Sequence, residues 1–151
     1  MRLILVRHAK AVPGGAGPDI ERPLAERGRA DAARIGEWLR AEGYAPDLAL
    51  VSPAARTMQT WEGLGLDAPM EARSEIYEAS AAALLRLASE AAGGTLMIVG
   101  HNPGISEAAE ALAGGTEGFP TGAVAVIDVE GEPAPGAGRL AAFVTPADLE
   151  G

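Results

Sequence analysis

The sequence contains no cysteine. Disulfide bonds, thiolate zinc sites and a cysteine nucleophile are therefore all excluded. Aromatic residues make up only 4% of the 151 residues although 48% are hydrophobic, so the core must be built mainly from Leu, Ile, Val and Ala. A chain of this length is typical of one globular domain, and we expect residues 1–151 to form a single domain.

Long hydrophobic segments are also missing. The apolar run at the N-terminus, Leu3–Val6, is too short for the core of a secretion signal and leads directly into Arg7. No other run approaches the roughly 20 residues that span a bilayer. These patterns predict a soluble cytoplasmic protein.

Basic residues are in the minority. The sequence has 12 Lys and Arg against 21 Asp and Glu, which gives a formal net charge of −9. A surface of this sign repels nucleic-acid phosphates and anionic lipids, so we expect neither nucleic acid nor a membrane as the main partner. A monomer is the default oligomeric state, which the sequence does not determine.

Short apolar runs alternate with helical patterns along most of the chain. Strands are predicted at residues 3–6, 48–51, 96–99, 123–129 and 140–144. Helices are predicted over residues 25–42, from 52 to about 65, over 79–92 and from 102 to about 113. This alternation predicts an α/β three-layer sandwich, with helices on both faces of a mostly parallel sheet and an antiparallel pair at one edge. The last residues are expected to form a frayed tail.

Two of the predicted helices begin with the same local signal. Ser52-Pro53 and Asn102-Pro103 each place a capping side chain before a proline, which is favoured at the first helical position. The sequence therefore predicts that Ser52 and Asn102 act as helix caps.

Both histidines of the chain, His8 and His101, follow predicted strands, where ligands bind in open α/β sheets. Arg7 precedes His8, and Arg56 lies near the start of the helix after the second strand, at an end that favours anions. Neighbouring strand residues point to opposite faces, so the backbone must turn for Arg7 and His8 to reach one pocket. Guanidinium and imidazole groups together predict a phosphate-sized pocket.

Each of these residues also has a plain structural explanation. A lone histidine is more often structural than catalytic, and Arg7 could be a solvated charge at a strand end. A metal site is disfavoured, because the arginines would repel a cation and neither histidine has a carboxylate pair at ligand spacing. We therefore expect no metal and no other cofactor.

Five segments carry these residues: Leu5-Val6-Arg7-His8-Ala9-Lys10-Ala11, Arg22-Pro23-Leu24 with Arg27-Gly28, Ser52-Pro53-Ala54-Ala55-Arg56-Thr57-Met58-Gln59-Thr60, Val99-Gly100-His101-Asn102-Pro103 and Phe119-Pro120-Thr121-Gly122-Ala123. In this order they resemble the motifs of the histidine phosphatase superfamily, which includes cofactor-dependent phosphoglycerate mutase. The first has the Arg-His-Ala-Lys form that is common in the SixA-like branch. The resemblance runs from about residue 2 to residue 129 and implies a phosphoglycerate mutase-like fold.

The resemblance also implies roles for individual residues. His8 would be the nucleophile that accepts the phosphoryl group, and Arg7, Arg56 and His101 would bind its oxygens. Arg22 would line the mouth of the pocket as a substrate-binding residue, the alternative being a surface pair with Asp19 or Glu21. Ala9 departs from the glycine of the wider family, which is acceptable if that position needs no positive φ.

Glu78 is the candidate proton donor. Ile76-Tyr77-Glu78 resembles the Leu-x-Glu segment that supplies the acid in larger members of the superfamily. The alternative is that Glu78 simply opens the helix predicted over 79–92, where acidic residues are favoured.

The resulting hypothesis is a metal-independent phosphatase. It would hydrolyse phosphohistidine on a protein, or phosphomonoesters, through a phosphohistidine intermediate on His8. The chain leaves little room for insertions that close over a small substrate, which favours a phosphorylated protein as partner. One alternative is a small-molecule phosphomonoesterase on the same scaffold. Another is a non-catalytic phosphoprotein-binding module, although binding alone does not require a nucleophile.

Overall fold

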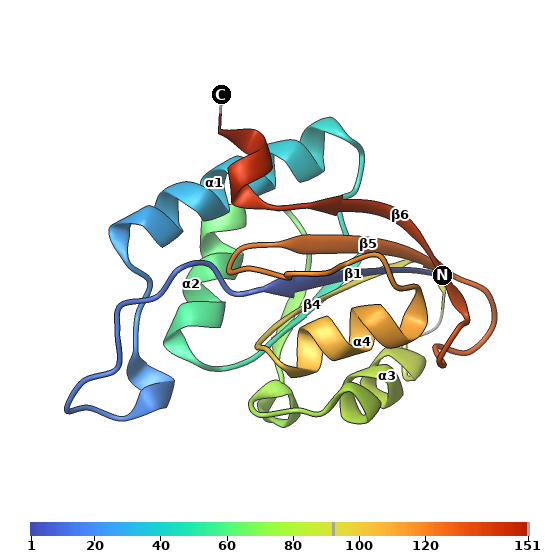
Figure 1. Ribbon diagram of the computed structural model, residues 1–151, viewed down its shortest axis with the longest axis horizontal. Coiled ribbons are helices and arrows are strands. Elements are labelled where there is room, and N and C mark those ends of the chain that lie inside the picture. Colours follow the sequence, from blue (N-terminus) through green and yellow to red (C-terminus); the bar gives the residue numbers. More distant parts are fainter. Residues whose placement is uncertain (92, 151) are drawn as a thin grey trace.

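A six-stranded sheet forms the centre of the computed structural model, which describes residues 1–91 and 93–150 (Figure 1). The strands are β1 (Arg2–Arg7), β2 (Leu48–Val51), β3 (Met70–Ala72), β4 (Thr95–Gly100), β5 (Val124–Val129) and β6 (Gly138–Val144). Their order in the sheet is β3-β2-β4-β1-β5-β6. The first four in this order are parallel, whereas β5 and β6 are antiparallel to their neighbours. The predicted α/β fold with an antiparallel edge is confirmed.

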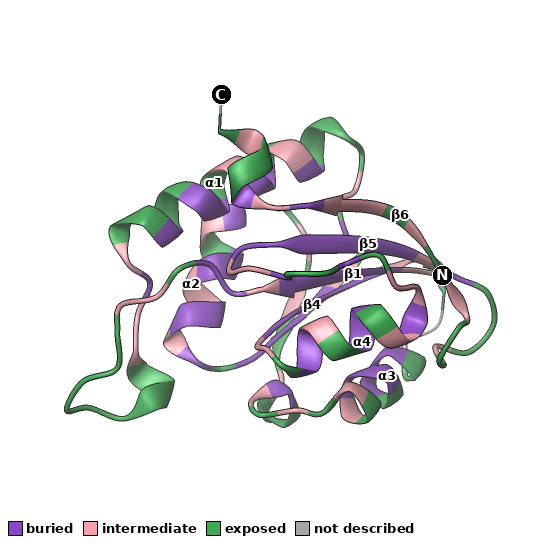
Figure 2. Cartoon of the chain, in the orientation of Figure 1, coloured by how far each residue is buried: buried purple, intermediate pink, exposed green. Residues whose placement is uncertain are grey.

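Two helices cover each face of the sheet. They are α1 (Glu26–Ala41) and α2 (Ala55–Leu64) on one face, and α3 (Ala81–Ser89) and α4 (Gly104–Leu112) on the other. Side chains of β1 alternate between the two layers, as a strand requires: Leu3 and Leu5 pack toward α3 and α4, and Ile4 and Val6 toward α1 and α2. Figure 2 shows the burial that results, with the central strands buried and the helices exposed only on their outer sides.

Helix α1 makes two unusually close backbone contacts. A Cβ atom at Gly28 would overlap the carbonyl oxygen of Lys10, and one at Gly36 would overlap the carbonyl oxygen of Leu64 at the end of α2. These glycines let α1 lie directly against the segment that follows β1 and against α2.

Three features of the chain differ from the sequence predictions. The end of the chain is not a frayed tail: Pro146–Leu149 form the 3-10 helix η3, which contacts α1. Thr145 and Asp148 form a reciprocal capping box at its start. The short strand β3 was not predicted. The predicted helix over 79–92 is shorter, since Ser80 caps α3, and its predicted end at residue 92 lies outside the described part of the chain.

The two predicted helix caps, Ser52 and Asn102, also differ from the N-cap residues in the structure. Helix α2 begins at Ala55 with Ala54 at its N-cap, so Ser52 lies before the helix and does not cap it. Helix α4 begins at Gly104 with Pro103 at its N-cap position. Asn102 still accepts a hydrogen bond through Oδ1 from the Ser106 amide, at 3.2 Å, so it does satisfy one free amide of α4. Within the described residues, none of the helices is both long and apolar enough to cross a bilayer.

Candidate active site

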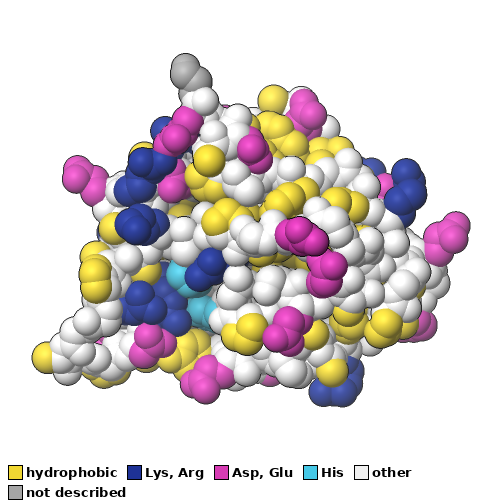
Figure 3. Space-filling model, in the orientation of Figure 1, with side chains coloured by type: hydrophobic (Ala, Val, Ile, Leu, Met, Phe, Trp, Pro, Cys, Tyr) yellow, Lys and Arg dark blue, Asp and Glu magenta, His cyan; other side chains and the backbone are white. Residues whose placement is uncertain are grey.

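The ends of β1 and β4 bring the two histidines together. These strands are parallel neighbours with Arg7 opposite Gly100, so His8 and His101 leave the sheet side by side. The His8 amide donates to the Gly100 carbonyl at 3.0 Å. The centroids of the two imidazole rings lie 5.5 Å apart. Figure 3 shows the histidines in a hollow of the surface, with Lys and Arg side chains around them.

The predicted turn after β1 is present. The strand ends at Arg7, and the amide of Gly122 contacts the carbonyl oxygens of both Arg7 and His8, at 3.1 and 2.9 Å. Gly122 adopts a φ of 79°, a conformation that glycine tolerates best. The Arg7 Nη1 donates to the Phe119 carbonyl at 3.1 Å. The segment before β5 therefore holds both the turn and the Arg7 guanidinium.

His8 is held with one ring nitrogen available. Its Nδ1 lies 2.7 Å from the Ala9 carbonyl oxygen, which can only accept, so Nδ1 carries the hydrogen and Nε2 keeps its lone pair. The pKa of His8 is lowered to about 4, mainly by burial; the Ala9 hydrogen bond opposes this shift, and the charges of Arg56, Arg7 and Arg22 add to it. At pH 7 the side chain is a neutral imidazole with a free Nε2.

His101 faces it from the end of β4. Its Nε2 lies 2.8 Å from Ser52 Oγ, and its Nδ1 is buried without a hydrogen-bond partner among the described residues. Burial, and then the nearby Arg56 and His8, lower the pKa of His101 to about 3. The ring of Tyr77 packs edge-on against the imidazole, with centroids 5.4 Å apart.

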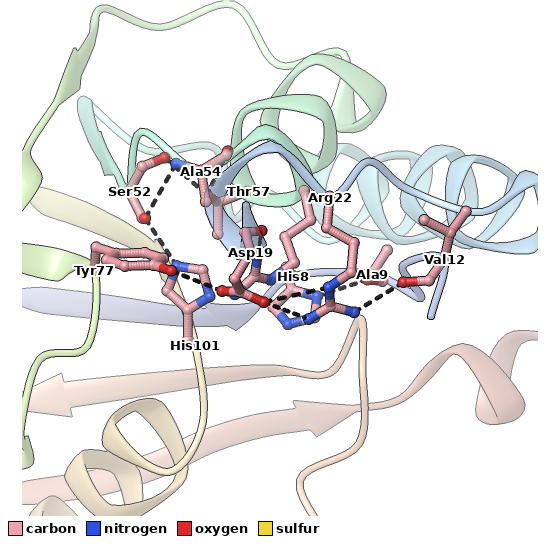
Figure 4. A network of polar contacts seen from close by, with 11 residues as sticks. His8, Ala9, Val12, Asp19, Arg22, Ser52, Ala54, Thr57, Tyr77 and His101 are labelled. Atoms are coloured by element: carbon pink, nitrogen blue, oxygen red, sulfur yellow. Dashed lines mark hydrogen bonds and ion pairs between the residues drawn. The ribbon is translucent and has the colours of Figure 1, made fainter. Parts of the chain in front are cut away.

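Arg56, the second residue of α2, is only 6% exposed. Its Nη1 donates to the Asp19 carbonyl at 2.9 Å and its Nη2 to Asp19 Oδ2 at 3.0 Å. The same Oδ2 accepts from the Tyr77 hydroxyl at 2.7 Å. Hydrogen bonds from Tyr77 and then Arg56 lower the pKa of Asp19 to about 2, so this carboxylate is ionised at neutral pH. Figure 4 shows Asp19 with Tyr77 and His101 on one side and His8 and Arg22 on the other.

Arg22 forms the ion pair with Asp19 that was one of its two predicted arrangements. It donates to the Val12 carbonyl at 2.9 Å and pairs with Asp19 Oδ1 at 3.3 Å. Its charge also contributes to the lowered pKa of His8. The surface pair with Asp19 is thus part of the pocket mouth.

Glu78 lines a groove of about 620 Å³ that begins at Arg56 and His101. It is exposed and has a φ of 62°, which is unusual for a residue other than glycine. Ser80, two residues later, is the N-cap of α3 and accepts from the Ala83 amide at 3.1 Å. The helix is therefore opened by Ser80, while Glu78 lies on the wall of the groove.

Three side chains of this site were not assigned to it from the sequence. Ser52 was interpreted as a helix cap, Asp19 as a surface partner of Arg22, and Tyr77 only as a spacer before Glu78. Asp19 could have been suspected on general grounds, because a buried arginine needs an acidic partner. No local pattern identifies which of the 21 acidic residues it is.

The fold and the site together define an α/β protein in which two histidines and nearby arginines meet where the strands end, and comparison with known proteins identifies its family. Residues 3–81 match the model of the histidine phosphatase superfamily, branch 1. An uncharacterized protein of Mycobacterium tuberculosis is 38% identical over 158 residues, which cover 93% of this chain and 99% of that protein.

Solved structures agree with this match. SixA of Agrobacterium tumefaciens is 33% identical with a TM-score of 0.85, over 96% of this chain and 98% of that chain. SixA of Nakamurella multipartitia is 29% identical with a TM-score of 0.86, over 96% of this chain and 95% of that chain. The chain belongs to the histidine phosphatase superfamily, in its SixA-like branch. It is a phosphatase, and its substrates are phosphorylated.

Proposed function

We propose that the protein hydrolyses phosphohistidine on other proteins, through a covalent phosphohistidine intermediate on His8. The observation that carries this proposal is the state of His8. Its Nδ1 is tied to the Ala9 carbonyl, and its Nε2 is a free nucleophile surrounded by guanidinium groups. The similar SixA structures of Agrobacterium tumefaciens and Nakamurella multipartitia are described as phosphohistidine phosphatases, which supports the substrate class.

The reaction has two transfers. His8 Nε2 attacks phosphorus and forms an N–P bond while the bond to the leaving group breaks and that group takes up a proton. Water then attacks the phosphorus, the N–P bond breaks, and inorganic phosphate and neutral His8 are released. Arg7, Arg56 and His101 bind the phosphoryl oxygens, because this chemistry depends mainly on positioning and charge stabilisation.

A phosphomonoesterase acting on small molecules is the second candidate. Glu78 on the wall of the groove favours it, because an alkoxide leaving group needs a proton from a general acid. The imidazole that leaves phosphohistidine takes its proton from solvent more readily than an alkoxide does, so this substrate needs Glu78 less.

Trapping the intermediate tests the proposal. Rapid acid-free quenching with labelled substrate is expected to give base-stable, acid-labile phosphate on the peptide that contains His8. His8→Ala should abolish both the label and turnover, because it removes the nitrogen that we propose as the nucleophile. His101→Ala should retain the ability to accept label, more slowly. Label on a peptide without His8, or none with full turnover, would refute the mechanism, and binding of phosphoprotein without turnover would support a binding module.

We also propose that the reaction needs no metal ion. Arg7 and Arg56 supply the positive charge that a cation would otherwise provide, and they would repel one. Incubation with EDTA should leave kcat/KM unchanged. Loss of activity in EDTA, restored by adding a divalent metal, would overturn this point.

A further inference from the structure

The Ser52 hydroxyl is completely buried directly behind His101. Its Oγ lies 2.8 Å from His101 Nε2, and the Ala54 amide donates to the same oxygen at 3.4 Å. We infer that Ser52 is a positioning residue that donates its hydrogen to His101 Nε2 and so fixes the neutral tautomer with hydrogen on Nδ1. Its consequence for catalysis rests on the function proposed above.

The assignment follows from counting donors and acceptors. A serine hydroxyl has one hydrogen to donate, and an amide N–H can only donate to it. Among the described residues, His101 Nε2 is the acceptor within hydrogen-bonding distance of Ser52 Oγ. If His101 instead carried its hydrogen on Nε2, the buried hydroxyl would face two donors and have no acceptor for its own hydrogen. Buried hydroxyls without partners are disfavoured, so Ser52 donates.

The opposite edge of the ring then carries a hydrogen into the pocket. His101 Nδ1 is buried and has no hydrogen-bond partner among the described residues. Figure 4 shows this edge turned away from Ser52, toward His8. An Nδ1–H group can donate to a phosphoryl oxygen held over His8, whereas the other tautomer would present a lone pair to that oxygen. His101 also stays neutral at pH 7, since burial lowers its pKa.

The two imidazoles would therefore have different roles in the reaction. Both carry hydrogen on Nδ1, but they turn different edges toward the substrate. His8 presents a bare Nε2 that attacks, and His101 presents an N–H that binds the transferring group. Two hydrogen bonds, one to the Ala9 carbonyl and one from the Ser52 hydroxyl, set this difference.

Nitrogen NMR measures the tautomer directly. Uniformly 15N-labelled protein at pH 7 gives two sets of imidazole signals, because the chain has only two histidines, and a His8→Gln variant assigns them. We expect His101 to show a protonated Nδ1 and a bare Nε2. A protonated His101 Nε2 in the wild-type protein would overturn the inference, and this result does not depend on any measurement of activity.

The Ser52→Ala variant tests the consequence. His101 should shift toward the Nε2-protonated tautomer while the His8 signals stay in place. On an aryl phosphate kcat should fall about tenfold, with a smaller change in KM. This loss is smaller than the roughly 10²–10³-fold loss seen when a charge-stabilising donor is removed outright. Ser106→Ala, which removes another hydroxyl from the segment after His101, is the matched control and should change neither signal nor rate.

The outcomes separate this inference from the proposed function. An unchanged tautomer in Ser52→Ala, or a shifted tautomer with unchanged kcat, would refute the role of Ser52 even if His8 is phosphorylated. Failure to trap phosphate on His8 in the wild-type protein would refute the proposed mechanism and leave the tautomer result standing. If Ser52→Ala does not fold, the wild-type spectrum decides the assignment.

Discussion

Glu78 is a single residue whose role depends on the leaving group. If it is the general acid, Glu78→Gln should lower kcat/KM about 10²–10⁴-fold for an alkyl phosphomonoester, which releases a poor leaving group. Phosphohistidine and p-nitrophenyl phosphate should be affected little, because their leaving groups depart without help. Steady-state kinetics on one substrate of each kind provides the measurement.

Glu107→Gln is the matched control for this prediction, because Glu107 lines the same groove. It should leave all three substrates unchanged. An equal, small loss for every substrate in Glu78→Gln would remove Glu78 from the mechanism. The pocket would then be specialised for good leaving groups, which favours phosphohistidine.

At the scale of elements, one carboxylate joins three segments around the pocket. Asp19 lies in the 3-10 helix η1 (Asp19–Glu21) and contacts Arg56 of α2 and Tyr77, which follows the 3-10 helix η2 (Ser74–Ile76). Its negative charge therefore lies beside the arginine that we assign to the phosphoryl group. In the free protein Asp19 occupies donors that an anionic ligand would use.

Asp19→Asn should bind inorganic phosphate more tightly as a result. Two unit charges about 4 Å apart in water interact by about 1 kcal/mol, so we expect the inhibition constant of phosphate to fall about fivefold. Glu21→Gln removes a charge from the same 3-10 helix and should have little effect. Weaker phosphate inhibition in Asp19→Asn would mean that the carboxylate mainly positions Arg56.

The sequence predicted the elements that have strong local patterns and missed those that do not. The apolar runs of β1 and β4 and the periodic face of α1 were sufficient to predict these elements, because buried strands and amphipathic helices require those patterns. Strand β3 has three residues and includes the exposed Glu71, so no alternation is visible. The Thr145–Asp148 capping box was a readable signal for η3 that was not used.

The candidate site likewise contains some residues that the sequence predicts and others that it does not. Arg7, His8, Arg56 and His101 lie next to strand ends or helix starts, so the order of elements predicts that they meet. The partner of Arg56 could not be predicted, because Asp19 is 37 residues away in the chain. Ser52 was misassigned because a serine before a proline has the same local sequence whether it caps a helix or faces a histidine.

For the whole molecule, the buried His8 and the half-buried His101 couple folding to pH. Their pKa values are lowered from 6.5 to about 4 and about 3, so between pH 6.5 and 4 the unfolded chain binds more protons than the folded protein. The contribution of the neutral histidines to the free energy of unfolding is therefore fully present above pH 6.5 and is lost as the pH falls. Each pH unit in this window costs up to about 1.4 kcal/mol for the buried His8, and less for the half-buried His101, whose charge is partly screened by solvent.

Urea unfolding at pH 7, 6, 5 and 4 measures this effect. The wild-type free energy of unfolding should fall more steeply than that of the double variant His8→Gln, His101→Gln, in which the carboxylates still titrate. Parallel curves for the two proteins would show that the histidines are not buried in their neutral form.

The close contacts of α1 have a consequence for how the sequence can vary. Every amino acid other than glycine has a Cβ, so any replacement of Gly28 or Gly36 forces α1 away from Lys10 or from the end of α2. Lys10 follows His8, the proposed nucleophile, by two residues, so the first displacement would reach the candidate active site. In a library of all single substitutions selected for phosphatase activity, both positions should accept only glycine, although neither residue belongs to the candidate site. In such a selection these positions would be as intolerant as catalytic residues, although glycine is required there only because two backbone segments lie very close together.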